Sequence, residues 1–414
     1  MTTLEIMGQN AKQASRVLMN AGAKKDAALY AIADALRANA QQIIAANDID
    51  IENGKAAGLT ESLLDRLRLS EERIEGMADG VTQVAAQNDP IGKVLEGRTL
   101  KNGLQIEKIT VPMGVIGIIF EARPNVTSDA AALCLKAGSA VILRGGKEAI
   151  NSNKAIAAVM RDAIEQAGLP RDCVALIEDT SRQSATELMQ LTDYLDVLIP
   201  RGGAGLIKSV VNNAKVPVIE TGVGNCHVYV DASADVKMAT DIVFNAKTSR
   251  PSVCNAIETV VIHKDIAEAV LPSIKAALDT KNVEIRGCER TKAILGDSVI
   301  DATEDDYARE FLDYILAIKV VDSIDDALDH IAKYSTGHSE CIVTSDYESA
   351  NRFTASVDSA AVYVNASTRF TDGGEFGLGA EIGISTQKLH ARGPMGLNEL
   401  TSSKFIIKGN GQIR

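Results

Sequence analysis

From residue 111 onward, short apolar runs alternate with segments of helical periodicity, and this alternation constrains the fold more than any other feature of the chain. Strands that are apolar throughout are typical of a parallel sheet with helices on both faces. One series lies within residues 114–219 and a second within 257–364. We therefore predict an α/β protein with two parallel-sheet domains, whose strands include 114–120, 140–143, 174–177, 195–199 and 216–219 in the first and 257–262, 315–321, 341–344 and 360–364 in the second.

Length and composition agree with two domains. A chain of 414 residues exceeds one compact core, and 46% hydrophobic residues against 24% charged ones suffice for a large interior. The net charge of −12 argues against nucleic acid or an anionic membrane as a main partner. The six cysteines show no spacing typical of a metal site, so we expect no bound metal and free thiols in a reducing cytoplasm.

The rest of the chain shows helices and a small β element. Helical patterns cover residues 3–45, with a break near residue 20, and residues 61–86. Residues 93–108 alternate around Asn102-Gly103, a dipeptide typical of a hairpin turn. A further strand is predicted at 404–408.

Cys254 has the surroundings of a reactive thiol. It lies between a helix-like segment and an apolar strand at 256–263, where the backbone can aim a side chain into a cleft. Lys247 and Arg250 precede it and would favour the thiolate that a nucleophile requires. An inert buried cysteine flanked by ordinary surface charges is the alternative interpretation.

Three strand ends of the first series carry polar or glycine-rich segments. Asn125 follows the first strand, at the sheet edge where ligands bind, and its amide can donate to an oxyanion or cap the next helix. Arg144-Gly-Gly-Lys147 suits a phosphate or a solvated turn, and the glycines from Gly202 to Gly205 open a helix whose N–H groups can bind phosphate. No segment fits G-x-G-x-x-G, which argues against an ordinary Rossmann dehydrogenase.

Taken in order, these features resemble the aldehyde dehydrogenase superfamily. More closely, the chain resembles the gamma-glutamyl phosphate reductase family over essentially its whole length. The matching blocks are Phe120-Glu-Ala-Arg-Pro-Asn-Val126, Leu143-Arg-Gly-Gly146, residues 247–259, residues 321–331 with His330, residues 334–340 with His338, residues 376–385 and Leu389-His-Ala-Arg-Gly393.

The resemblance implies an aldehyde dehydrogenase-like fold in three parts. Residues 1–92 and 111–225 would form a cofactor-binding domain, 226–400 a catalytic domain, and 93–110 with 401–414 a small β flap for oligomerisation. Isolated hairpins are marginally stable, so docking on another subunit is expected. A homo-oligomer is implied, with dimer and tetramer both open.

Residue roles follow from the same resemblance. Cys254 matches the nucleophile, and Asn125 matches the side chain that forms the oxyanion hole with the backbone N–H of Cys254. Glu220 matches the water-activating glutamate of hydrolytic members, a role that conflicts with an acyl-phosphate reductase because its thioester must not be hydrolysed. The predicted cofactor contacts are Arg144 to a ribose, Lys147 to the 2′-phosphate of NADP(H), Gly202 and Gly203 to the pyrophosphate, and Glu310 to the nicotinamide ribose.

The implied reaction is the NADPH-dependent reduction of L-glutamyl 5-phosphate to L-glutamate 5-semialdehyde and phosphate through a Cys254 thioester, a step of proline biosynthesis. A glutamate 5-kinase that supplies the acyl phosphate is a possible partner. The candidate anion ligands for the substrate are Arg123, Arg250 and Arg369. His330 and His338 are expected to pack or hydrogen-bond.

Two other classes of protein remain to be weighed. A cysteine acyltransferase or hydrolase would use Cys254 and Asn125 as well, but the basic strand end at Arg144 and the glycine-rich helix start would then have no task. A regulatory module without activity would tolerate the loss of Cys254 or Asn125, and both are present. The reductase is therefore the preferred hypothesis.

Overall fold

The structure is a computed structural model that describes residues 1–414 apart from the side chain of Ser62. The chain forms two compact units: unit 1 comprises Met1–Thr221, Gly377–Gly383 and Met395–Arg414, and unit 2 comprises Gly222–Phe376 and Ile384–Pro394. The first boundary lies near the predicted one at residue 225. The two returning segments, however, include residues that the sequence analysis assigned to the second domain.

Hydrogen bonds join the two returning segments to unit 1 and to each other. The side-chain amide of Gln87 donates to the carbonyl of Leu378 at 2.8 Å. Ile382 donates to the carbonyl of Met395 at 3.0 Å, and Met395 donates to that of Gly383 at 2.8 Å. Such pairing between residues distant in sequence leaves no compositional signal, so a sequence pattern does not reveal it.

Unit 1 is built on a four-stranded parallel sheet with the order β5-β4-β3-β6. Every residue of β3 is buried, because the sheet is covered on both faces. The strands are β3 (Val115–Phe120), β4 (Ala140–Arg144), β5 (Val174–Leu176) and β6 (Val197–Arg201). The helices are α1 (Thr3–Leu18), α2 (Lys24–Ala38), α3 (Ala40–Ala56), α4 (Glu61–Leu67), α5 (Glu71–Ala86), α6 (Asn125–Lys136), α7 (Ile150–Gln166), α8 (Arg182–Met189) and α9 (Ala204–Asn213).

The prediction of a strand at 216–219 was wrong, because the structure has only a single β-bridge there. Only Val218 pairs there, in parallel with Leu198. Pro217 accepts a hydrogen bond from the N–H of Leu198 at 2.8 Å but has no N–H to return, so the ladder does not continue.

The carboxyl ends of β3, β4 and β6 meet at one edge of the sheet. Ile119 lies opposite Arg144, and Phe120 lies opposite Arg201. The segments that carry Asn125, Lys147 and Gly202 leave from these ends, so the sheet brings them to the same edge, as the sequence analysis predicted.

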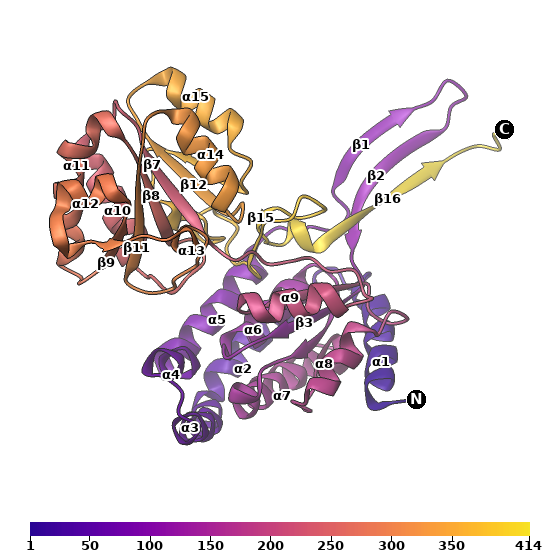
Figure 1. Ribbon diagram of the computed structural model, residues 1–414. Coiled ribbons are helices and arrows are strands. Elements are labelled where there is room, and N and C mark those ends of the chain that lie inside the picture. The colour runs from indigo at the N-terminus through magenta and orange to yellow at the C-terminus, as the bar shows by residue number, and fades with distance from the viewer. The chain divides into compact units, whose positions relative to one another are not determined.

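A small antiparallel sheet completes unit 1. Its strands β1 (Val94–Thr99), β2 (Gln105–Pro112) and β16 (Thr401–Lys408) have the order β1-β2-β16, so the C-terminal strand runs along the hairpin (Figure 1). The hairpin predicted at Asn102-Gly103 is confirmed, and Gly103 has the left-handed φ of 88° that such a turn requires. β16 is longer than the predicted 404–408.

Unit 2 contains a seven-stranded parallel sheet with the order β10-β9-β11-β8-β7-β12-β13. Helices α10, α11 and α12 cover one face, and α14 and α15 cover the other (Figure 1). The strands are β7 (Cys226–Val230), β8 (Ile257–His263), β9 (Glu284–Gly287), β10 (Ile300–Asp301), β11 (Ile315–Val321), β12 (Ser339–Val343) and β13 (Ala361–Val364), with a separate pair β14 (Ile384–Ser385) and β15 (Gly393–Pro394). The helices are α10 (Val236–Thr248), α11 (Lys264–Asp279), α12 (Glu289–Leu295), α13 (Glu304–Tyr307), α14 (Ile324–Tyr334) and α15 (Tyr347–Ser356).

These two parallel sheets and the small antiparallel sheet confirm the predicted α/β class. Three strands of the seven-stranded sheet of unit 2 were not predicted. β9 and β10 are short and partly polar, and β7 contains a histidine, so none of them forms a continuous apolar run. Within the described part of the chain, no helix combines the length and apolar character needed to span a bilayer.

Candidate active site

Cys254 lies on the connection between α10 and β8, the position predicted from the sequence. The side chain of Asp235 caps the start of α10 by accepting the N–H of Met238 at 2.8 Å, and the helix ends at Thr248. Cys254 is half-buried, whereas four other thiols, at positions 134, 173, 226 and 341, are buried. Its thiol is therefore better placed for chemistry than for packing.

Two neighbours hold the backbone of Cys254. A Cβ atom on Gly224 would lie 1.6 Å from the carbonyl oxygen of Cys254 and 2.6 Å from its Cα, so only glycine fits there. The thiol of Cys226 donates to the same carbonyl at 3.1 Å. Burial raises the pKa of Cys226 well above its ordinary value, so that group keeps the proton it donates.

Arg369 contacts the segment that carries Arg250 and Cys254. Its Nε donates to Ser249 Oγ at 3.0 Å, and its Nη1 donates to the side-chain oxygen of Asn255. Burial and then the positive charge of Arg250 lower the pKa of Arg369, whereas the charges of Asp372, Cys254 and Glu375 raise it. The guanidinium of Arg369 is a group that can bind an anion next to this segment.

Glu310 also belongs to this part of unit 2. Its Oε1 accepts the N–H of Gly224 at 2.8 Å, and Gly224 is the residue that contacts the backbone of Cys254. Burial raises the pKa of Glu310. The structure therefore brings four predicted site residues of unit 2 into one region: Cys254, Arg250, Arg369 and Glu310.

Lys247 is not the surface charge that the alternative interpretation proposed. Its side chain is 0% exposed, and its Nζ lies 2.6 Å from Oε2 of Glu258, which is 0% exposed as well. Burial lowers the pKa of Lys247 and raises that of Glu258 to about 7. The sequence analysis missed Glu258, although a carboxylate inside the apolar strand β8 is an unusual feature that signals a buried partner.

Asn125 is the first residue of α6 in unit 1 and is exposed. Its Nδ2 donates to Oδ2 of Asp129, one helical turn later, at 2.8 Å. Burial raises the pKa of Asp129 to about 6. The amide carries a second N–H, which can serve an oxyanion. Asp129 was missed, and its signal is the spacing of four residues from Asn125.

The two basic residues after β4 differ in their surroundings. Nη2 of Arg144 donates to the carbonyls of Thr180 and Ser181, at 2.7 and 2.9 Å, so this guanidinium supports a neighbouring turn. Lys147 begins a 3₁₀ turn (Lys147–Ala149) and is exposed. Lys147 is the better placed of the two for a ligand phosphate, and the ribose contact of Arg144 stays a prediction.

The start of α9 already binds an anionic group. The N–H of Gly203 donates to Oε2 of Glu121 at 2.9 Å, and a Cβ atom on Gly202 would lie 2.6 Å from the same oxygen. The positive end of a helix attracts phosphate for the same reason that it attracts this carboxylate. The helix start thus fits a pyrophosphate that displaces Glu121.

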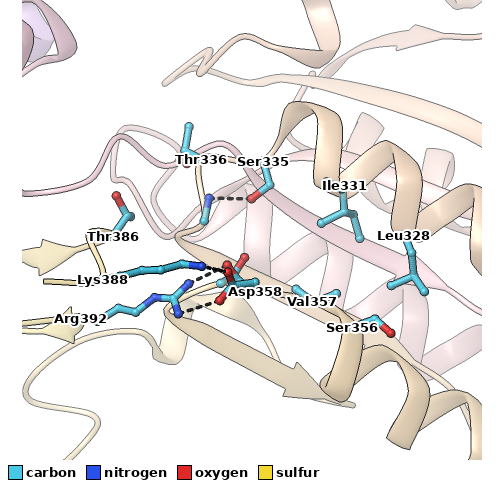
Figure 2. A pocket seen from close by; sticks show the side chains of 13 residues that line it. Leu328, Ile331, Ser335, Thr336, Ser356, Val357, Asp358, Thr386, Lys388 and Arg392 are labelled. Atoms are coloured by element: carbon cyan, nitrogen blue, oxygen red, sulfur yellow. Dashed lines mark hydrogen bonds and ion pairs between the residues drawn. The ribbon is translucent and has the colours of Figure 1, made fainter.

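Unit 2 also contains a hollow of about 400 Å³, which sequence reasoning did not predict (Figure 2). Lys388 and Arg392 both reach Asp358, and the Arg392 Nη1 to Asp358 Oδ1 distance is 2.8 Å. Asp358 therefore neutralises only one of the two positive charges of the wall. One wall residue, Thr336, also accepts the N–H of Asn225 at 3.0 Å.

His330 is a packed residue in this structure. Its ring lies against Tyr307 and Tyr334, with centroid distances of 5.0 and 4.6 Å. Burial lowers its pKa to about 3, so the imidazole is neutral near pH 7. The expectation of a packing role for His330 agrees with this environment.

Comparisons with known proteins cover the whole chain. The sequence profile of the aldehyde dehydrogenase family matches residues 3–314. The gamma-glutamyl phosphate reductase of Clostridium novyi (strain NT) is 63% identical over 390 residues, which are 94% of this chain and 93% of that protein. That of Clostridium botulinum (strain Eklund 17B / Type B) is 60% identical over 415 residues, 100% of both chains. The crystal structure of gamma-glutamyl phosphate reductase from Thermotoga maritima has a TM-score of 0.97 and 49% identity and covers 100% of both chains.

Proposed function

This chain belongs to the aldehyde dehydrogenase family and, within it, to the gamma-glutamyl phosphate reductases, and we propose that it reduces L-glutamyl 5-phosphate to L-glutamate 5-semialdehyde with NADPH through a thioester on Cys254. Family membership makes it an oxidoreductase of proline biosynthesis that acts on a small molecule and uses a nicotinamide cofactor. The thioester, the choice of NADPH and the residue roles are the proposal.

In the proposed reaction, the Cys254 thiolate attacks the acyl carbonyl of the substrate. The carbon–sulfur bond forms, and the bond from the acyl carbon to the phosphate oxygen breaks with both electrons leaving on phosphate. Phosphate is a good leaving group and needs no strong acid. When bound, the cofactor would supply the hydride that reduces the thioester. The carbon–sulfur bond then breaks with its electrons returning to Cys254, which releases the semialdehyde and regenerates the thiolate. Asn125 and the backbone N–H of Cys254 stabilise the oxyanion.

The observation that carries this proposal is that the guanidinium of Arg369 bonds to Ser249 and Asn255, in the same segment as Arg250 and Cys254, which places a pair of cationic side chains at this segment. A substrate whose leaving group is phosphate needs cations next to the attacked carbon, and guanidinium is well suited to phosphate oxygens. An ordinary aldehyde oxidation to a free acid has no phosphate to bind. The pair therefore favours an acyl-phosphate substrate.

The test is turnover in the reverse direction, with L-glutamate 5-semialdehyde, NADP⁺ and inorganic phosphate. NADPH formation, measured at its absorbance band, is expected to depend on phosphate. In Arg369→Met we expect the KM for phosphate to rise about 10–100-fold, because a charged hydrogen-bonding partner is lost. Arg286→Met, in the same unit but bound to Glu284 and Asp306, is the control that keeps the wild-type KM. Equal turnover without phosphate would refute the acyl-phosphate assignment.

Asn125→Ala is expected to lower kcat by about 10²–10³-fold, because one oxyanion donor is removed. Substrate KM should change much less, since the contact forms with the tetrahedral intermediate. Asn20→Ala, at an exposed turn of unit 1, is the matched control. An Asn125→Ala enzyme with wild-type kcat would remove Asn125 from the oxyanion hole.

Lys147→Glu tests the proposed preference for NADPH. The new carboxylate would repel a 2′-phosphate, so the NADPH-to-NADH ratio of kcat/KM is expected to fall about 10–100-fold. Lys55→Glu, an exposed lysine of α3, controls for the change in net charge. An unchanged ratio would show that another residue selects the cofactor.

We also propose that the small sheet of β1, β2 and β16 joins subunits of a homo-oligomer. Phe405 and Ile407 of β16 are 55% and 56% exposed, and every residue of β1 is exposed. A three-stranded sheet with so much exposed apolar surface gains stability when it docks on a second copy.

A further inference from the structure

We propose that the buried pair of Lys247 and Glu258 is a positioning device for Glu310. In this view the pair fixes the backbone of residues 310–312 and so sets the place of the Glu310 carboxylate relative to Cys254. The inference rests on the cofactor role proposed above for Glu310, and neither Lys247 nor Glu258 touches substrate or cofactor in it.

The pair itself is enclosed. Nζ of Lys247 lies 2.6 Å from Oε2 of Glu258 and donates to the carbonyl of Ile257 at 3.1 Å, and both side chains are 0% exposed. Apolar replacements of a buried ion pair are often as stable as the pair, because desolvation of two charges offsets their attraction. Stability alone therefore does not explain why these two charged residues are present. The remaining carboxylate oxygen of Glu258 indicates a second role for the pair.

The second carboxylate oxygen of Glu258, Oε1, binds the backbone of a strained turn. Oε1 of Glu258 accepts the N–H of Leu312 at 3.1 Å. Leu312 has a φ of 57°, the left-handed region that a residue with a branched apolar side chain rarely adopts. The side chain of Leu312 is 39% exposed, so its own packing does not fix this conformation. The hydrogen bond to the buried carboxylate of Glu258 fixes the conformation of Leu312. Strained backbone of this kind is often found at functional sites.

The turn leads directly to the predicted cofactor ligand. Glu310 lies two residues before Leu312, and its Oε1 accepts the N–H of Gly224 at 2.8 Å. Gly224 in turn contacts the carbonyl of Cys254 so closely that a Cβ atom would lie 1.6 Å from it. A continuous set of contacts within unit 2 therefore connects the buried pair to Glu310 and Glu310 to the nucleophile backbone.

The two charges of the pair have opposite effects on Glu310. Burial raises the pKa of Glu310, while the N–H of Gly224 and the charge of Lys247 lower it. The charge of Glu310 also raises the pKa of Glu258, because the two carboxylates repel each other. The pair therefore acts on Glu310 through the backbone of residues 310–312.

The test variant is Lys247→Met/Glu258→Leu, which replaces the pair by apolar side chains of similar volume. We expect it to fold with a Tm near that of the wild type but to bind NADPH with a Kd raised about tenfold, as measured by fluorescence titration. Lys237→Met/Asp241→Leu, which removes an exposed ion pair from the same helix, is the matched control and should keep the wild-type Kd. A folded double variant with wild-type Kd would overturn the proposal.

Two further variants separate positioning from general stability. Asn adopts the left-handed region more readily than Leu, so adding Leu312→Asn to the double variant should restore part of the NADPH affinity. Failure of this rescue in a folded protein would contradict an action through the Leu312 backbone. If the double variant does not fold, Lys247→Met/Glu258→Met, which also removes the acceptor for the Leu312 N–H, takes its place, and a wild-type Kd in that folded variant would overturn the claim that the pair positions Glu310.

Glu310→Gln distinguishes this inference from the proposed function. If Glu310→Gln binds NADPH as tightly as the wild type, the cofactor role of Glu310 fails and the positioning inference falls with it. If Glu310→Gln weakens binding while the Lys247→Met/Glu258→Leu variant does not, only the positioning inference fails.

Discussion

Replacement of Cys254 by alanine is expected to abolish turnover, with a loss in kcat on the order of 10⁵-fold or more, because no other group can form the acyl-enzyme. The loss should appear with no change in Tm beyond about 2 °C, since the thiol is half-buried and lies on a connection. Cys288→Ala is the matched control, because Cys288 is also a half-buried thiol of unit 2. Residual turnover within 100-fold of wild type would exclude covalent catalysis by Cys254.

Gly224→Ala is expected to produce the second largest loss. A Cβ atom 1.6 Å from the carbonyl oxygen of Cys254 is sterically impossible, so the backbone of the nucleophile or of Gly224 has to move. A displacement of about 1 Å at a reacting group can cost on the order of 100-fold in rate. We therefore expect kcat to fall at least about 100-fold, with a lower Tm as well.

The control for Gly224→Ala is Gly76→Ala. Gly76 lies on α5, and no atom is within 4 Å of a Cβ built there. Alanine favours the helix, so this variant should be as stable as the wild type or slightly more stable. A Gly224→Ala enzyme with unchanged kcat and a normal Tm would show that the contact between Gly224 and Cys254 does not exist in solution.

The fold class could be predicted because strands buried on both faces are apolar throughout. β3 is such a strand, and it was predicted within one residue of its observed bounds. β11, which is apolar apart from Lys319, was predicted at its observed bounds. β9 and β10 could not be found in this way, because strands of four and two residues with polar members show no periodicity. The hairpin turn was predictable because its chemistry is local to Gly103.

A residue of the candidate site could be predicted only where its type and its position in the sequence indicate its chemistry. A cysteine at a connection, and an asparagine or glycines at a strand end, could be singled out as Cys254, Asn125 and Gly202. Gly224 could not, because its importance lies in a contact with a residue distant in the sequence. Glu258 is marked in the sequence as a carboxylate in an apolar strand, but its contact with Leu312 is not. The close approach of Gly224 to Cys254 exists only once β7 and β8 have paired.

Some of the cofactor contacts could likewise be predicted from the sequence, and others could not. The helix start at Gly202 and Gly203 was predicted from its glycines, and it carries the carboxylate of Glu121 where an anion was expected. For Arg144, by contrast, the sequence could not show that Thr180 and Ser181 would lie within reach of its guanidinium. That contact depends on how the segment after β5 folds back.

The most direct test of the thioester is a single-turnover experiment without phosphate. The enzyme is mixed with L-glutamate 5-semialdehyde and NADP⁺, NADPH is followed by its absorbance, and the protein is then analysed by peptide mass spectrometry. We expect a burst of about one NADPH per chain, a glutamyl adduct on the peptide that contains Cys254, and steady turnover only after phosphate is added. Steady NADPH formation without phosphate, or a burst with no adduct on Cys254, would contradict the proposed mechanism.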